Sequence, residues 1–359
     1  MRAIDAPATR MPEFPGLRFR HFRSIDEDIP GMAAANQAAR SADGEAQPVD
    51  VDDMRSGYSL MERCDPARDI CVVESDGVIV GYARVDWDDL LGGTRDYWSV
   101  CLLSPAIRRP EVIRAMHDWT EARRLAVATE HRAAGHALDR PCFLATDCLD
   151  GDLATTDLLR ATGYEPYRRF AALVRPDLEG IATPPVPDGL EVRPIVHEDA
   201  LLRRIYDAET EAFRDEFNAR DMSENDYARF LAEPGQDLAL WSIAFDGDEV
   251  AGGVRSSIKL THDGVREGWL DPVFTGRAWR RRGVARALIG RTLLLLRAQG
   301  ADRAALVADL QSPNQTLTLY ESCGFRLVSS TTSWRRPLDL DLDLRGATAR
   351  VPVASESGR

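Results

Sequence analysis

Lysine is almost missing from this chain of 359 residues. Lys259 is the single lysine among 45 basic side chains, and the formal net charge at pH 7 is −13. This acidic balance disfavours a general nucleic-acid binder, which needs a basic surface to neutralise phosphates. Long apolar runs are missing as well: no stretch approaches the roughly 18 residues that a membrane-spanning helix needs. We therefore expect neither nucleic acid nor a membrane as a partner.

Motifs built on cysteine, histidine or serine are equally scarce. The six cysteines form no C-x-x-C pair, and the sequence has no metal-ligand spacing and no nucleophile elbow. Because the N-terminus also lacks a signal-peptide pattern, we expect reduced thiols and a cytoplasmic protein. These absences predict a protein that uses no metal.

A proline-rich stretch divides the chain. Residues 175–189 hold four prolines and two glycines, a composition typical of a linker. We predict a disordered N-terminus over 1–15, a first domain over 16–175, a linker over 176–188, and a second domain over 189–338. The tail, 339–359, is predicted to be mostly disordered, although its Asp-Leu alternation favours a strand that continues to about Leu344.

The two halves repeat each other at a nearly constant offset, with one insertion near residues 126–140. The matching segments are Gly16–Arg20 with Gly189–Arg193, Asp76-Gly77 with Asp246-Gly247, Arg108-Arg109 with Arg280-Arg281, and Gly163-Tyr164 with Gly324-Phe325. Two copies of one unit are therefore predicted.

Periodicity in the second half predicts alternating strands and helices. Strands are expected at 190–195, 238–245, 249–260, 267–274, 304–308 and 329–335, and helices at 200–217, 223–232, 284–299 and 314–323. This order predicts an α/β fold in which helices cover both faces of a mixed sheet.

The segment Arg280-Arg281-Arg282-Gly283-Val284-Ala285 precedes the helix expected from residue 284. The first N–H groups of a helix lack internal partners and carry positive partial charge, so a diphosphate can bind there. Glycine allows close approach of the backbone, and the arginines add charged donors. The competing interpretation is an arginine-rich loop before an ordinary helix.

A second motif follows at Asn314-x5-Tyr320-x3-Gly324-Phe325, where a short helix begins near Ser312-Pro313 and ends at Gly324. Tyrosine on such a helix is usually a packing residue. Here it follows a candidate diphosphate site, so its phenol becomes a candidate proton donor to a leaving group.

These motifs, together with Trp269-Leu-Asp-Pro-Val-Phe-Thr275, resemble the GNAT superfamily of acyl-CoA-dependent N-acyltransferases over about 150 residues, 190–338. The resemblance implies acetyl-CoA as cosubstrate. It implies that Val273, Phe274 and Thr275 pair with pantetheine and that Tyr320 protonates the departing thiolate. It further implies pyrophosphate binding by Arg280, Arg281, Arg282, Gly283, Val284 and Ala285, and a cofactor contact from Asn314.

Pro272 agrees with this resemblance, because proline in a central strand indicates a bulge. The fourth strand of the family bulges and separates from the fifth, which opens a slot for acyl-CoA. The alternative is that residues 269–274 form an edge strand.

Acylation of an amine also needs a base, because an alkylammonium is not nucleophilic at neutral pH. Glu267 opens the strand on which GNAT enzymes often place a glutamate base, although it also fits a solvated turn. Glu211 and Asp215 belong to an acid-rich stretch that resembles the acceptor side of the family, or else a solvated helix face. A small, cationic primary amine is the predicted acceptor.

The first repeat is predicted to be degenerate. Glu111 stands where the second repeat has Gly283, and Pro110 replaces Arg282. Leu153 and Leu159 stand where Asn314 and Tyr320 stand. A carboxylate repels a diphosphate, so we expect one acetyl-CoA per chain.

Three functions remain open at this stage: an N-acetyltransferase, an acyl-CoA-binding sensor without turnover, and a tandem scaffold without a cofactor. A narrower form of the first is acetylation of a cysteinyl amino sugar, since the tandem arrangement resembles mycothiol synthases. Monomer and homodimer are both compatible with the sequence.

Overall fold

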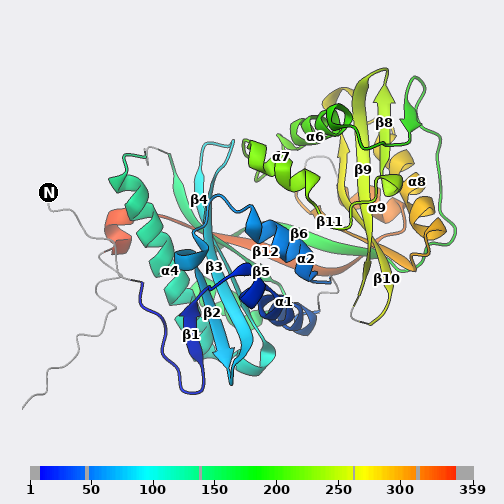
Figure 1. Ribbon diagram of the computed structural model, residues 1–359. Helices are drawn as coiled ribbons and strands as arrows, with labels where there is room; N and C mark the ends of the chain where they lie inside the picture. The colour runs from blue at the N-terminus through cyan, green and yellow to red at the C-terminus, as the bar shows by residue number, and fades with distance from the viewer. Residues whose placement is uncertain (1–8, 45–47, 137–139, 262, 313–315, 345–359) are drawn as a thin grey trace, which may run out of the picture.

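The computed structural model of the protein describes residues 9–44, 48–136, 140–261, 263–312 and 316–344. Two lobes lie beside each other, and long strands near the centre run from one lobe into the other (Figure 1). Among the helices of these ranges, none is both long and apolar enough to cross a membrane.

The first half of the chain folds into strands and helices, one of which is long. In order, its elements are β1 (Arg18–His21), α1 (Ile25–Ala42), α2 (Val51–Ser59), α3 (Pro66–Asp69), β2 (Ile70–Ser75), β3 (Val78–Asp89), β4 (Arg95–Leu103), the 3-10 turn η1 (Pro105–Ile107), α4 (Pro110–Ala133), β5 (Cys142–Leu149), α5 (Leu153–Ala161) and β6 (Glu165–Arg175).

The second half repeats this order. Its elements are β7 (Glu191–Arg193), α6 (Asp199–Phe213), α7 (Glu224–Leu231), η2 (Leu238–Leu240), β8 (Ser242–Asp246), β9 (Glu249–Leu260), β10 (Arg266–Thr275), η3 (Arg277–Trp279), α8 (Val284–Ala298), β11 (Arg303–Asp309), α9 (Thr316–Ser322) and β12 (Arg326–Pro337). The predicted mixed α/β fold built from two related units is confirmed. The predicted insertion coincides with the greater length of α4, which has 24 residues against 15 in α8.

Local chemistry explains many element boundaries. Asp76 and Gly77, like Gly247, have positive φ in the tight turns of the two β-hairpins, where a left-handed conformation joins antiparallel strands. Ser223 accepts a hydrogen bond from the backbone N–H of Asp226, and the Asp226 side chain reaches back to the backbone of Ser223. This capping box fixes the start of α7.

All 12 strands of the described residues form one sheet, in the order β1-β2-β3-β4-β5-β12-β6-β11-β10-β9-β8-β7. The last strand of each repeat therefore lies beside the other repeat: β12 pairs with β5, β6 pairs with β11, and β6 and β12 pair with each other. Residues 176–190 contain no helix or strand. Although the sequence divides at this linker, the hydrogen bonding of the sheet crosses between the repeats.

The hydrophobic cores also contain side chains that come from the other repeat. The core under α4 contains Trp334 of β12, and the core under α8 contains Ala171 and Leu173 of β6. Fully burying a leucine side chain contributes about 1.5–3 kcal/mol relative to leaving it exposed. Each repeat is therefore stabilised by side chains that the other repeat supplies.

At both ends of the described chain, the structure differs in part from what the sequence predicts. Residues 340–344 are helical, so the expected extension of the last strand to Leu344 is wrong. Leu340 and Leu344 are buried in the core under α4, and tertiary contact there outweighs the strand-like alternation. At the other end, Met11 and Phe14 pack against the same core.

Candidate active site

The N-terminus of α8 is open to solvent. Gly283 occupies the N-cap position with a φ of 89°, and Arg281 has a φ of 64°, so the chain makes a left-handed turn into the helix. A Cβ added to Gly283 would meet no atom of the described residues within 4 Å. Gly283, Val284 and Ala285 line a cavity at the start of α8, where the first N–H groups of a helix can bind a diphosphate.

The three arginines before Gly283 have different environments. Arg281 lines the cavity beside the helix start, together with Arg286 of the first turn of α8. Arg282 is exposed. The Arg280 guanidinium is directed instead at protein groups, because it donates to the backbone oxygens of Thr275 and Ala212.

A slot opens beside the C-terminal half of β10. This strand pairs with β11 at Glu267–Arg303, Gly268–Ala304 and Trp269–Ala305. Its pairing with β9 shifts between Leu270 and Val273, so Asp271 and Pro272 lie opposite one residue. That is the bulge expected at Pro272. Beyond it, Val273, Phe274 and Thr275 pair with β9 on one side, and no strand of the described residues pairs with them on the other, where an extended amide chain could bind.

A cavity of about 710 Å³ joins the slot to the helix start. It brings together most of the residues predicted to bind the cofactor or to act on it. From that set, the lining contains Val273, Phe274, Thr275, Arg280, Arg281, Gly283, Val284, Ala285 and Tyr320. The predicted cofactor contact, Asn314, falls outside the described residues.

Tyr320 reaches the cavity from α9 and is 6% exposed. Its ring packs edge-on against Phe325, with 6.1 Å between the centroids. Burial raises the pKa of the Tyr320 phenol above its ordinary value, and the negative charge of Asp271 raises it further. The phenol is therefore protonated at neutral pH, as a proton donor must be.

Comparison with known proteins agrees with this geometry. Residues 202–325 match the acetyltransferase (GNAT) family. The chain carries a GNAT acetyltransferase domain. It is 28% identical over 334 residues to a mycothiol acetyltransferase of Geodermatophilus obscurus, which covers 88% of this chain and 97% of the relative. It is also 28% identical over 314 residues to a mycothiol acetyltransferase of Salinispora arenicola, covering 86% and 94%.

Solved structures show the same tandem fold. A GCN5-related N-acetyltransferase from Sphaerobacter thermophilus has a TM-score of 0.67 at 19% identity, covering 91% of this chain and 97% of that one. A tandem GNAT protein from the clavulanic acid biosynthesis pathway has a TM-score of 0.63 at 17% identity, covering 89% and 98%. The GNAT domain thus belongs to a chain with two GNAT-like folds.

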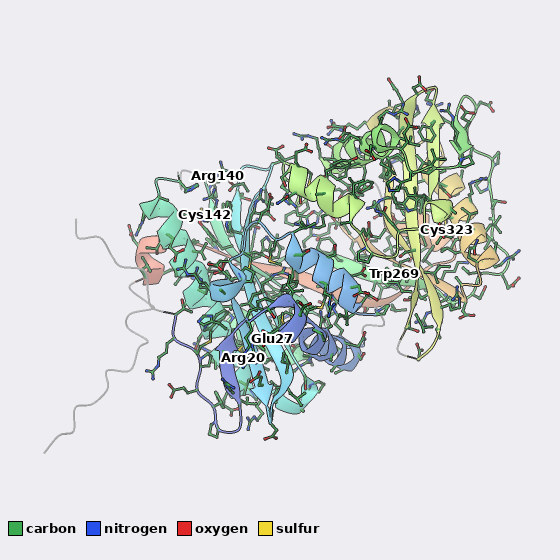
Figure 2. The ribbon with its side chains drawn as sticks, in the orientation of Figure 1. Arg20, Glu27, Arg140, Cys142, Trp269 and Cys323 are labelled. Atoms are coloured by element: carbon green, nitrogen blue, oxygen red, sulfur yellow. The ribbon has the colours of Figure 1, made fainter. Side chains whose placement is uncertain are left out.

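Glu267, the predicted base, lies inside the protein. Its side chain is fully buried and accepts hydrogen bonds from Trp269 Nε1 at 3.0 Å and from Arg303 Nε. Trp269 lies in the C-terminal lobe of the GNAT tandem (Figure 2). Glu267 is also absent from the described cavity lining. It precedes the point where β10 and β11 part, and its carboxylate accepts hydrogen bonds from a residue of each strand.

Asp271, on the same strand, does reach the cavity. It lies in the bulge, four residues along β10, or about 13 Å at the usual strand rise. It lines the cavity, and the residue as a whole is exposed. Desolvation by the surrounding protein raises the pKa of Asp271, and the positive charge of Arg255 opposes this shift. A carboxylate immediately before the proline of an expected bulge is the sequence signal that would have pointed to Asp271.

The acids predicted to bind the acceptor lie elsewhere. Asp215 is held by Arg277 and Arg280, and hydrogen bonds from Arg280 and then Arg277 lower its pKa. Glu211 lies 3.6 Å from Arg277. The structure therefore places both beside the arginines of the helix start. Glu216, three residues from Phe213 at the end of α6, does line the cavity, and its Oε1 accepts from Ser312 Oγ at 3.2 Å.

The first repeat lacks this opening. α4 begins two residues earlier in the repeat, at Pro110, and its N-cap Arg109 has an ordinary φ of −92°. Arg108, the counterpart of Arg280, donates to Asp43 at 2.5 Å. The strands β4 and β5 pair over five positions, from Arg95–Cys142 to Ser99–Thr146, whereas β10 and β11 pair over three. The slot is thus shorter, and proline removes an N–H from the helix start.

Across the described ranges, no group of three or more His, Cys, Asp or Glu residues is placed to hold a metal ion.

Proposed function

We propose that the C-terminal repeat transfers the acetyl group of acetyl-CoA directly to a primary amine of a small molecule. One observation carries the proposal: a single cavity connects an open helix start, the free side of β10, a buried phenol and a solvent-accessible carboxylate. The first two fit a diphosphate and a pantetheine arm. The last two supply an acid and a base in the same cavity.

In the reaction, the acceptor nitrogen forms a bond to the thioester carbonyl carbon and the carbon–sulfur bond breaks. Asp271 takes a proton from the acceptor ammonium, which frees the nitrogen lone pair. Its raised pKa brings this carboxylate nearer to neutral pH, where a general base is most effective. Tyr320 gives its phenolic proton to the departing sulfur. The amide nitrogen loses a second proton, the phenol is restored, and one proton is released in total.

Charge on the cavity wall supports a cationic acceptor. Glu216 and Asp271 both line the cavity. Asp309 lines it as well but is paired with Arg168. An ammonium group near the first two carboxylates would gain charge-assisted hydrogen bonds.

A second candidate is acetylation of a cysteinyl amino sugar. It is favoured by the two relatives named mycothiol acetyltransferase, which this chain matches over 97% and 94% of their lengths. Both candidates need a free amine, and they differ in the rest of the acceptor.

Release of free thiol from acetyl-CoA tests these proposals, with polyamines, aminoglycosides, amino acids and cysteinyl amino sugars as acceptors. Turnover on the first two classes supports a cationic acceptor, and turnover restricted to the last supports the second candidate. Tyr320→Phe is the matched control and must lose most of the rate. Coenzyme A binding without turnover on any acceptor would instead indicate a sensor.

A further inference from the structure

The Arg280 side chain joins three separate parts of the second lobe. Its Nε donates to the oxygen of Thr275 at 3.2 Å, at the end of β10. One terminal nitrogen donates to the oxygen of Ala212 at 2.8 Å, in the last turn of α6. The other donates to the carboxylate of Asp215 at 2.9 Å, just beyond α6. A planar guanidinium can donate hydrogen bonds in three directions at once, and here all three acceptors are protein groups.

The segment that Arg280 holds forms one wall of the cavity. We call residues 212–222 the acceptor wall, because Phe213, Glu216 and Asn218 of this segment line the cavity. Its far end is fixed to the first repeat, where the N–H of Leu91 donates to Ala219 at 2.8 Å. Arg280 fixes its near end. The last carbonyls of a helix lack internal partners, so the bond to Ala212 also satisfies the end of α6.

The electrostatics of this junction favour the same role. Asp215 is shared between Arg280 and Arg277, and Glu211 lies 3.6 Å from Arg277, so two carboxylates balance the two arginines at this junction. A bound diphosphate would add negative charge next to this group. Arg281 and Arg286 line the cavity and are better placed than the occupied guanidinium of Arg280 to contact that anion.

We propose that Arg280 is a positioning residue that couples the cofactor site to the acceptor wall, and that it is not a phosphate ligand. When the helix start is occupied, Arg280 and Asp215 hold residues 212–222 in the conformation that shapes the acceptor end of the cavity. This inference rests on the proposed function only in placing coenzyme A at the start of α8. It predicts that cofactor binding orders the acceptor wall.

Hydrogen exchange of the full-length protein, with and without saturating coenzyme A, tests the coupling without any knowledge of the acceptor. In the wild type, we expect residues 212–222 to gain protection when coenzyme A binds. Arg280→Met keeps the aliphatic stem and removes all three hydrogen bonds. We expect it to bind coenzyme A within about threefold of wild type by calorimetry and to lose the cofactor-dependent gain.

Arg281→Met is the matched control on the neighbouring residue. We expect at least a tenfold loss of coenzyme A affinity, while the gain in protection at saturation is retained. Asp215→Asn removes the other partner and should reproduce the exchange result of Arg280→Met. A merely structural role would change protection equally in both states, so the difference between states reports coupling.

Two results would overturn the inference. One is a wild type that binds coenzyme A without any change at residues 212–222. The other is an Arg280→Met variant that loses as much affinity as Arg281→Met and keeps the gain at saturation. A wild type that binds no coenzyme A in the initial titration would overturn the proposed function itself, and the calorimetry reports that separately.

Discussion

Gly283→Ala separates the conformational role of this glycine from its role as an opening for the diphosphate. Its φ of 89° lies in the left-handed region, where a side chain costs roughly 1–2 kcal/mol. The added methyl meets no described atom within 4 Å in the free protein, so that strain is the expected loss of stability. In the complex, the methyl would occupy the space against which the diphosphate packs.

The expected loss of affinity follows from the bonds at stake. A hydrogen bond to a charged group contributes about 1.5–3 kcal/mol. Loss of one backbone donor to the diphosphate therefore predicts a roughly 10- to 100-fold weaker coenzyme A complex. Gly283→Glu adds a negative charge and should abolish detectable binding.

Gly300 provides a matched control at the opposite end of the same helix. Its φ is 78°, and an added Cβ would approach only the Arg266 side chain, at 3.7 Å, among the described atoms. Gly300→Ala should therefore show a similar loss of thermal stability and leave coenzyme A affinity unchanged. Thermal unfolding and calorimetry measure the two quantities. Equal coenzyme A affinity for Gly283→Ala and Gly300→Ala would refute the assignment of the diphosphate to the start of α8.

The remaining predictions concern stoichiometry, the acid, the base and the acceptor. Calorimetry should give one acetyl-CoA per chain, and two equivalent sites would contradict the degeneracy of the first repeat. Tyr320→Phe should lower kcat roughly 100-fold with little change in coenzyme A affinity; an unchanged kcat in steady-state assays would make the phenol structural. In the wild type, kcat/KM should rise with pH as Asp271 deprotonates through its raised pKa, and Asp271→Asn should lower the rate and flatten this rise. Glu267→Gln should keep the rise of kcat/KM with pH and instead lower the free energy of unfolding by about 2 kcal/mol, since it weakens a buried ion pair. A flat pH profile for Glu267→Gln, with an unchanged rise for Asp271→Asn, would identify Glu267 as the base. Glu216→Gln should raise KM for a cationic acceptor several-fold, and a silent variant would favour a neutral one.

Local sequence was sufficient to predict the helix start and the bulge. Glycine alone adopts a φ near 90° readily, so an arginine-rich run ending at Gly283 predicts an open helix terminus without knowledge of the rest of the chain. Pro272 similarly predicts a bulge because it has no N–H for the strand ladder. The turns at Asp76-Gly77 and Asp246-Gly247 depend on the same short-range rules. Most elements of the second repeat were predictable from their periodicity for this reason.

The choice between Glu267 and Asp271 needed the tertiary structure. Both carboxylates belong to β10, and periodicity alone places them on the same face of a strand. Only the extent of pairing with β11 shows that Glu267 lies before the strands part and that Asp271 lies after it. The partner of Glu267, Arg303, is 36 residues away in sequence, beyond the reach of a local pattern.

The sequence by itself thus predicted two related units, a helix that starts after Gly283 and a short helix that carries Tyr320, because each depends on contacts within a few residues or on regular spacing. The tertiary structure decided which repeat each last strand joins, where Arg280 directs its donors, and why residues 340–344 are helical. Those features depend on pairing and burial between segments far apart in the chain. Several local arrangements satisfy the same sequence pattern there, and packing selects one of them.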